Sequence, residues 1–181
     1  MGKNILVLTG SPRAGGNSDR LAQAFVEGAQ EAGHTVNVFA AGRANIGGCR
    51  ACEACFTQGR PCVFEDDFGR LDSYLREAEG IALASPLYWY DFTAQLKAAI
   101  DRLSAYSGRG ILRIKESVLL LCGAVEEREK FAGAIEVYRL ITQGSLNWRD
   151  RGVVLAPGCG DKGAILGHPA LEEARALGKF I

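Results

Sequence analysis

The 181-residue sequence predicts one α/β domain over residues 1–181, in which a parallel sheet of five strands is covered by helices on both faces. Three observations predict this fold class. Short apolar runs alternate along the chain with longer segments of helical periodicity, as in βα units. Three of the five runs are continuously apolar, as expected for strands that are buried on both faces. The length suits a single core, and the sequence contains no internal repeat or interdomain linker.

The predicted strands are short apolar segments separated by helical patterns. They cover residues 3–9, 35–39, 80–85, 117–123 and 152–156. The first, third and fourth are the continuously apolar ones, which is typical of strands covered on both faces. Because a helical pattern lies between each pair of segments, the strands are expected to be parallel and joined by right-handed crossovers.

The predicted helices are segments in which apolar residues recur at helical spacing. They cover residues 18–32, 66–78, 92–106, 126–143 and 170–179. The first carries Leu21, Phe25 and Ala29 on one face, and Gly33 ends it. The second has aspartates in its first turn, as the helix dipole favours, and Leu71 lies in its apolar stripe.

The later helices follow the same rule. The third repeats Leu96 and Ile100 four residues apart, and the fourth repeats Phe131 and Ile135. The fifth closes the chain. Five strands in this length favour the flavodoxin-like strand order 2-1-3-4-5 over the dinucleotide-binding order. Both orders place ligands at the carboxyl ends of the strands, beside the point where the strand order reverses.

Composition argues against several classes of partner. The 21 Lys and Arg residues balance the 21 Asp and Glu residues, so no broad electrostatic field favours nucleic acid or an anionic membrane. The apolar runs are far shorter than the ~20 residues that a membrane span needs, and no signal-peptide pattern opens the chain. We therefore expect a cytoplasmic protein with no nucleic-acid or membrane partner, whose six cysteines are reduced.

A loop of small residues, TGSPRAGGNS over residues 9–18, joins the first strand to the first helix. It is not a P-loop, because Gly16 is followed by Asn17 instead of a lysine, and its glycines lack the dinucleotide-binding spacing. The remaining phosphate-binding interpretation is a single phosphate held by backbone N–H groups at the helix start and by polar side chains. Those side chains are Ser11, Arg13, Asn17 and Ser18. The structural alternative is a glycine-rich turn in which Asn17 or Ser18 caps the helix.

An aromatic segment, SPLYWY over residues 85–90, follows the third predicted strand. Because both segments follow strands of one parallel sheet, we expect it at the same edge as the small-residue loop. A flat ring system such as isoalloxazine can stack on such side chains. The alternative is that Trp89 and Tyr90 cover the end of the sheet or form a subunit contact.

Four cysteines lie in an irregular insertion at about residues 40–65. Cys49, Cys52, Cys55 and Cys62 form the pattern C-x2-C-x2-C-x6-C. Thiolates at this spacing converge from one tight turn and suit a cubane cluster or a tetrahedral metal. Structural zinc, a reversible dithiol and reduced thiols without function remain open. The other two cysteines, Cys122 and Cys159, are expected to be structural.

Three segments together carry a family resemblance: GSPRAGGNS, ASPLYWYDFTAQLKAAIDR and the cysteine run before FEDD. They resemble the flavodoxin-like NAD(P)H-dependent FMN reductase family, from Lys3 to about Arg102 and more loosely to the end of the chain. The resemblance implies that the FMN phosphate is held by Ser11, Arg13, Asn17 and Ser18. It implies that the isoalloxazine and ribityl are held by Pro86, Leu87, Tyr88 and Trp89, with a further contact from Gly123.

The cysteine pattern resembles that of the iron–sulfur flavoproteins, a branch of the same family. That resemblance implies that Cys49, Cys52, Cys55 and Cys62 bind a [4Fe–4S] cluster that passes electrons to FMN. The insertion follows the second strand at the sheet edge, so we expect it near a flavin at a subunit interface.

The activity implied by the resemblance is that of an oxidoreductase. NAD(P)H would reduce a non-covalently bound FMN, and a quinone, free flavin or similar small molecule would accept the electrons. The resemblance also implies a homodimer or homotetramer, with Trp89, Tyr90 and Tyr106 at the contact. Two alternatives stay open: an electron carrier that receives electrons from ferredoxin, and a non-enzymatic flavin- or metal-binding redox sensor. No catalytic side chain is predicted, since hydride transfer to flavin N5 requires no acid or base.

Overall fold

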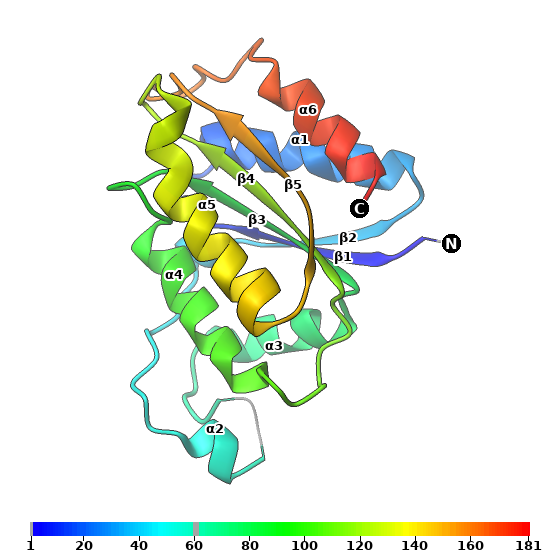
Figure 1. Cartoon of the computed structure of the whole chain (residues 1–181), viewed down its shortest axis with the longest axis vertical. Coiled ribbons are helices and arrows are strands. Elements are labelled where there is room, and N and C mark those ends of the chain that lie inside the picture. Colours follow the sequence, from blue (N-terminus) through cyan, green and yellow to red (C-terminus); the bar gives the residue numbers. More distant parts are fainter. Residues whose placement is uncertain (1, 60–61) are drawn as a thin grey trace.

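The computed structural model describes residues 2–59 and 62–181 and confirms the predicted fold. Parallel strands form a five-stranded sheet in the order β2-β1-β3-β4-β5 (Figure 1). The strands are β1 (Asn4–Thr9), β2 (Thr35–Phe39), β3 (Gly80–Pro86), β4 (Glu116–Cys122) and β5 (Arg149–Ala156). The order reverses around β1 and β3, which is where folds of this type bind their ligands.

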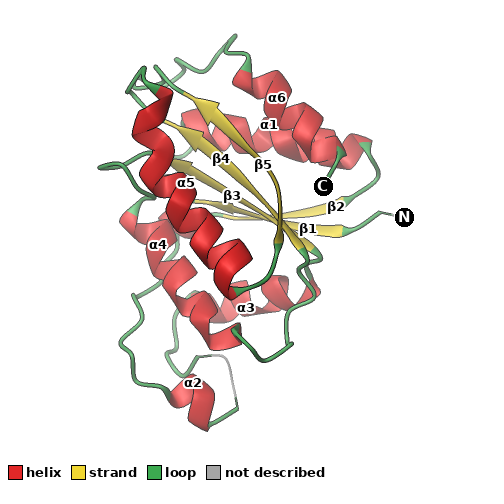
Figure 2. Cartoon of the chain, in the orientation of Figure 1, coloured by secondary structure: helices red, strands yellow, loops and turns green. Residues whose placement is uncertain are grey.

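Helices cover both faces of the sheet (Figure 2). One face carries α1 (Asn17–Glu31) and α6 (Ala170–Lys179), and the other carries α3 (Phe68–Glu77), α4 (Ala94–Asp101) and α5 (Ala132–Arg139). The short helix α2 (Ala54–Thr57) lies in the predicted insertion, at the end of the molecule away from α6 (Figure 1). Residues 60 and 61 of that insertion lie outside the described residues.

Each buried strand supplies apolar side chains to two cores. In β1, Ile5 and Val7 belong to the core that contains the apolar residues of α1 and α6. Leu6 and Leu8 belong to the core on the opposite face, with α3, α4 and α5. All four side chains are 1% exposed or less, which explains why the sequence of this strand is continuously apolar.

Two predicted helices are interrupted. The segment 126–143 contains a 3₁₀ turn at Arg128–Phe131, then α5, then a π-helix at Leu140–Ser145. The charged residues before Phe131 are exposed and lie outside the α-helix, because Phe131 is the first side chain of this segment to reach the core. The segment 92–106 begins as α4 and tightens into a 3₁₀ helix at Arg102–Tyr106.

The last strand begins at Arg149, earlier than the predicted residue 152. Its first residues are charged, and β5 is an edge strand, where polar side chains are tolerated. Asp150 accepts a hydrogen bond from the Tyr138 hydroxyl at 3.1 Å, which accounts for this carboxylate beside the core.

The buried side chain of Thr93 fastens the start of α4 to the loop after β1. Its Oγ1 donates to the carbonyl oxygen of Gly10 at 2.7 Å and accepts from the N–H of Leu96 at 3.3 Å, which makes it the helix N-cap. Its own N–H donates to Ser85 Oγ at 3.2 Å. One residue therefore fixes the distance between the loops that follow β1 and β3.

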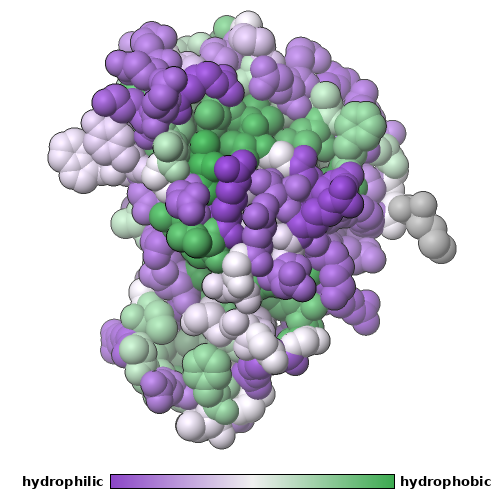
Figure 3. Space-filling model, in the orientation of Figure 1, coloured by the Kyte–Doolittle hydropathy of each residue, from purple (hydrophilic) through white to green (hydrophobic). Residues whose placement is uncertain are grey.

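Figure 3 shows hydrophilic residues over much of the helical layers, a hydrophobic area in the upper half of the view between α5 and α6, and a mixture of hydrophobic, neutral and hydrophilic residues over the lobe that carries α2. Within the part of the chain that the structure describes, no helix has both the length and the apolar composition to cross a membrane.

Candidate functional site

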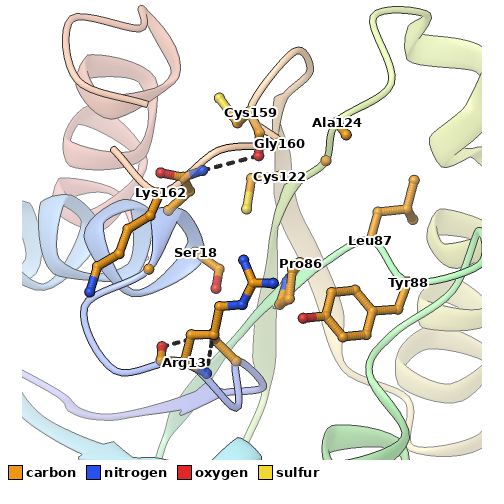
Figure 4. A pocket seen from close by; sticks show the side chains of 14 residues that line it. Arg13, Ser18, Pro86, Leu87, Tyr88, Cys122, Ala124, Cys159, Gly160 and Lys162 are labelled. Carbon is orange, nitrogen blue, oxygen red and sulfur yellow. Dashed lines mark hydrogen bonds between the residues drawn. The ribbon is translucent and has the colours of Figure 1, made fainter. Parts of the chain in front are cut away.

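A pocket opens at the carboxyl edge of the sheet, between the loops that follow β1, β3, β4 and β5 (Figure 4). We call it the carboxyl-edge pocket. The residues that line it are Ser11, Arg13, Gly16, Asn17, Ser18, Pro86, Leu87, Tyr88, Cys122, Gly123, Ala124, Cys159, Gly160 and Lys162. Of the nine residues predicted to bind FMN, every one except Trp89 lies in this wall.

The loop after β1 is held in shape by its own hydrogen bonds. The Ser11 hydroxyl donates to the carbonyl oxygen of Arg13 at 2.9 Å and accepts from the N–H of Arg13 at 3.1 Å. Gly15 has a φ of +65°, and its N–H donates to Asp19 Oδ2 at 2.9 Å. The Ser11 side chain therefore shapes the loop, and a glycine occupies the left-handed position that the turn requires.

The start of α1 offers donors to the pocket. The first intrahelical hydrogen bond runs from the N–H of Arg20 to the carbonyl oxygen of Gly16, so the N–H groups of residues 17–19 have no acceptor within the helix. The Ser18 hydroxyl oxygen is buried and has no hydrogen-bond partner among the described residues. A helix N-terminus with an unsatisfied buried hydroxyl fits an anion such as a phosphate.

We call the part of the pocket beside Ser18 and the first N–H groups of α1 the anion-sized space. Two basic side chains approach it from opposite sides. Arg13 is exposed, and its guanidinium extends into the pocket toward Pro86 and the hydroxyl of Tyr88 (Figure 4). Lys162 extends from the loop after β5 to the loop after β1, and its Nζ donates there to the carbonyl oxygen of Ala14 at 3.3 Å. The pocket therefore combines N–H donors with positive charge.

Asn17 uses its side chain to brace the loop after β5. Its Nδ2 donates to the carbonyl oxygens of Cys159 at 3.0 Å and Asp161 at 2.7 Å, and its Oδ1 accepts from the N–H of Gly163 at 2.9 Å. Both side-chain N–H groups of Asn17 are thus used, so the amide has no donor left for an anion, whereas the sequence predicts a side-chain ligand. What Asn17 leaves for an anion is its backbone N–H.

The segment after β3 divides at a tight turn. Tyr88 and Asp91 exchange two backbone hydrogen bonds, of 2.9 and 3.1 Å. The two residues between them, Trp89 and Tyr90, have φ values of +52° and +69°, so the turn is left-handed at both positions. Pro86, Leu87 and Tyr88 line the pocket, whereas Trp89 is 93% exposed and lies outside it.

In this turn Trp89 packs against Tyr90, whereas the sequence predicts that it contacts the flavin. Its ring stacks on that of Tyr90, with centroids 6.3 Å apart, and both rings face outward. Both therefore stay available for the predicted subunit contact. Tyr106 does not, because it is buried and its hydroxyl donates to Asp72 at 2.5 Å. The prediction that Tyr106 forms a subunit contact is wrong.

Sequence reasoning missed the part of the wall that comes from the loop after β5. Cys159 and Gly160 lie there, and the N–H of Cys159 donates to the carbonyl oxygen of Gly123 at 2.7 Å. Beside them, burial raises the pKa of the Cys122 thiol to about 12, so this thiol is neutral near pH 7. The glycine-rich stretch GCGDKG after the last predicted strand is the signal that could have indicated this loop.

The four clustered cysteines line a second pocket. Cys49, Cys52, Cys55 and Cys62 all contribute to its wall, as do Phe64 and Arg102. We call it the four-cysteine pocket. Positive φ values of +50° at Ala51 and +57° at Glu53 turn the chain between the cysteines. The N–H of Ala51 donates to Cys49 Sγ at 3.4 Å. Among the described residues, no three metal-binding side chains are grouped closely enough to hold an ion.

The two pockets lie at opposite ends of α4. Thr93, the N-cap of α4, touches the loop after β1, and Arg102, which follows α4, lines the four-cysteine pocket. Nine helical steps separate these residues, which is about 14 Å. The two sets of lining residues have no member in common within the described chain.

Comparison with known proteins points to one family. The family model for NADPH-dependent FMN reductases matches residues 3–138. An iron-sulfur flavoprotein from Archaeoglobus fulgidus is 33% identical over 128 residues, which are 70% of this chain and 57% of that protein. One from Methanosarcina thermophila is 37% identical over 98 residues, which are 54% of this chain and 51% of that protein. The chain spans about half the length of the curated relatives that it matches.

Solved structures support the fold. An NAD(P)H:quinone oxidoreductase from Methanothermobacter marburgensis superimposes with a TM-score of 0.75 and 24% identity, over 99% of this chain and 96% of that chain. An azoreductase from Bacillus anthracis gives a TM-score of 0.73 and 18% identity, over 99% of this chain and 100% of that chain. At these identities the likeness concerns the fold alone.

The brace at Asn17 generates a prediction. Replacing Asn17 by Ala removes three hydrogen bonds, two of which satisfy carbonyl groups of the loop after β5. We expect the free energy of unfolding to fall by about 2–4 kcal/mol, measured by urea denaturation. Hydrogen exchange should accelerate at residues 159–163. The control is Gln23→Ala on the exposed side of α1, which should shift stability by less than about 0.5 kcal/mol. Equal shifts in the two variants would contradict the brace.

Proposed function

The chain belongs to the NADPH-dependent FMN reductase family, and from this premise we propose that it binds FMN in the carboxyl-edge pocket as a flavin-dependent oxidoreductase. The observation that carries the proposal is the anion-sized space at the start of α1. There the unpartnered Ser18 hydroxyl and the free N–H groups of the helix meet the guanidinium of Arg13. These donors fit the phosphate of FMN.

The rest of the pocket suits the ring and the ribityl chain. Pro86, Leu87 and Tyr88 form an apolar wall beside the anion-sized space, and Gly123 faces them from the end of β4. A Cβ at Gly123 would lie 3.2 Å from the Cβ of Leu87 and 3.2 Å from the ring of Phe131, so a larger residue there would press on both side chains. Flat aromatic ligands bind in clefts of this kind, with backbone groups meeting their polar edge.

Bound FMN would supply the redox chemistry, by accepting a hydride and passing on the electrons. The residues of this chain would bind the phosphate, orient the ring against Pro86–Tyr88 and exclude water from its inner face. The Cys122 thiol in the wall is neutral near pH 7, so it adds no charge beside the ring. No side chain of the wall is assigned as an acid or base. The outer face of the ring would remain accessible from solvent, where the electron donor and the acceptor would reach it.

We propose NAD(P)H as the donor and a small molecule, such as a quinone or free flavin, as the acceptor. The family description supports the nicotinamide, and a quinone oxidoreductase and an azoreductase share the fold. The iron–sulfur flavoproteins among the relatives support the alternative of an electron carrier, for which we propose ferredoxin as the electron donor.

The phosphate assignment predicts a ligand-specific effect of Arg13→Ala. A charge-assisted hydrogen bond contributes roughly 1.5–3 kcal/mol, so FMN affinity should fall by about tenfold to a hundredfold. Riboflavin has the same ring and ribityl without the phosphate, and its affinity should stay the same. Fluorescence titration of both ligands measures the two changes.

The control for this variant is Arg20→Ala, an exposed arginine of α1 that does not line the pocket. It should leave both affinities unchanged. The assignment fails if Arg13→Ala binds FMN as tightly as the wild type, or if riboflavin loses as much affinity as FMN.

A second proposal concerns the four-cysteine pocket, which we infer holds an iron–sulfur cluster. The supporting observation is that Cys62 lies in the same wall as Cys49, Cys52 and Cys55, although seven positions separate it from Cys55 in the sequence. The spacing of the first three cysteines alone keeps them in one stretch of chain, whereas Cys62 reaches the same wall only through the fold of the insertion. A bound cluster would supply an electron-transfer centre, and the four thiolates would hold it.

The cluster predicts a metal content that depends on Cys62. Protein purified without oxygen should contain about four iron and four sulfide per chain, and Cys62→Ala should lose most of both. The matched control is Cys159→Ala, whose thiol lies in the other pocket and should leave the iron content unchanged. Wild-type protein that contains zinc or no metal would rule out the cluster.

A further inference from the structure

Arg102 is a buried cation at the neck of the insertion. The residue is only 3% exposed, and a guanidinium is almost never that buried unless it is paired. It follows α4 directly and lines the four-cysteine pocket. We define the neck as residue 47, where the chain approaches Cys49, together with residues 64–66, where it returns after Cys62. No feature of the sequence singled out Arg102.

The guanidinium joins both sides of this neck. Nη1 donates to the carbonyl oxygen of Gly47 at 3.3 Å and to Asp66 Oδ2 at 2.5 Å, and Nη2 donates to the carbonyl oxygen of Phe64 at 3.5 Å. Asp66 Oδ2 also accepts from the N–H of Gly47 at 3.0 Å. The group lies 4.2 Å from the centre of the Phe68 ring. Each connection between the insertion and the sheet is therefore tied to the end of α4.

Asp66 behaves as the partner of a fixed cation. Burial opposes its ionisation, but the hydrogen bonds from Arg102 and from the N–H groups of Gly47 and Phe68 outweigh burial and lower the pKa of this carboxyl. The nearby pair of Arg70 and Asp67 differs in exposure, because the Arg70 side chain is 73% exposed and that of Arg102 is 2% exposed. Exposed pairs hold little structure together, whereas breaking a buried pair is strongly destabilising.

One N–H donor of the Arg102 guanidinium has no acceptor among the described residues. Its Nε is buried and has no hydrogen-bond acceptor within residues 2–59 and 62–181. Buried N–H groups of this kind usually have a partner, and Arg102 lines the same pocket as the four cysteines. A thiolate or a sulfide in that pocket is an acceptor of the right charge.

We propose that the Arg102–Asp66 ion pair is a clasp that closes the four-cysteine loop before any metal binds, which makes Arg102 a positioning residue for a thiolate-bound metal centre. The inference rests on the proposed metal-binding role of the cysteines. The clasp acts on the backbone at residues 47 and 64, on either side of the cysteines, so it holds the four cysteines around one pocket. The protein thus forms the pocket before a metal enters it.

The test compares Arg102→Gln and Asp66→Asn with the wild type, each as the full FMN-loaded chain treated with a chelator. The first readout is the affinity for Co²⁺, whose thiolate complexes absorb strongly, measured by competition with a chelator. The second readout is the rate of trypsin cleavage after Arg50, an exposed residue between the first two cysteines, in metal-free protein. The control is Arg70→Gln, which breaks the exposed pair beside the neck.

The clasp predicts the same direction for both test variants. Co²⁺ affinity should fall by at least about tenfold, and cleavage after Arg50 should accelerate by at least about tenfold, since a buried ion pair has been broken. Arg70→Gln should match the wild type in both readouts. FMN affinity should be unchanged in all variants, which shows that the domain is folded, because the FMN pocket lies at the other end of α4. Arg102→Lys, which keeps the charge but not the fork of donors, should recover the wild-type values only in part.

Three results would overturn the clasp. Wild-type rates and affinities in Arg102→Gln would show that the residue positions nothing. A fall in Co²⁺ affinity in Arg102→Gln with a rise in Asp66→Asn would show that charge alone matters. Slow cleavage after Arg50 in both variants would show that the loop stays closed without the ion pair. A wild type that binds no Co²⁺ through its thiols would instead refute the metal-binding role of the cysteines, and the cleavage rates would still decide the clasp.

Discussion

Parallel pairing of β1 with β3 is the constraint on which both candidate sites depend. The pairing runs from Ile5 opposite Gly80 to Thr9 opposite Ala84, and a further hydrogen bond of 2.7 Å joins the N–H of Gly10 to the carbonyl oxygen of Ala84. The loops that follow the two strands therefore leave the sheet side by side. Thr93 then locks α4 to the first of these loops through Gly10. The anion-sized space and the apolar wall of the carboxyl-edge pocket follow from this arrangement.

Helix α4 links the loop after β1 to the insertion at the other end of the molecule. Its N-cap contacts the loop after β1, and the buried Arg102 beyond its last turn holds the neck of the cysteine insertion. A fixed cation at this place is costly to bury, and Asp66 together with two backbone carbonyls compensates for the cost. The insertion packs Cys55 and Cys62 against the core, and Arg109 donates to the carbonyl oxygen of Cys55 at 2.8 Å. Arg102 and the helix that presents it hold the two ends of the insertion.

Much of the fold could be predicted because the signals are local. Continuous apolar runs such as residues 5–8 occur where a strand is buried on both faces, and the helical stripes mark which side each helix buries. The pocket was predictable only in part. Arg13 and Ser18 stand in the loop that the sequence points to, whereas Asn17 bonds to a loop 142 to 146 positions away, and no local pattern shows that. The exposed position of Trp89, outside the pocket wall, could not be read from the sequence, because a left-handed turn of two bulky aromatic residues has no sequence signature. In the sequence, Arg102 is one more basic residue after an amphipathic helix, and only the structure shows that it is buried.

We propose that this chain carries a flavin that nicotinamide reduces. The most direct test is the visible absorbance spectrum of protein purified without oxygen, recorded while NADPH or NADH is added stepwise. We expect the absorbance of oxidised flavin in the purified protein, released as FMN on denaturation, and its stoichiometric bleaching by one of the two nicotinamides. Protein that contains no flavin and takes up none, or whose flavin neither nicotinamide bleaches, would contradict the claim.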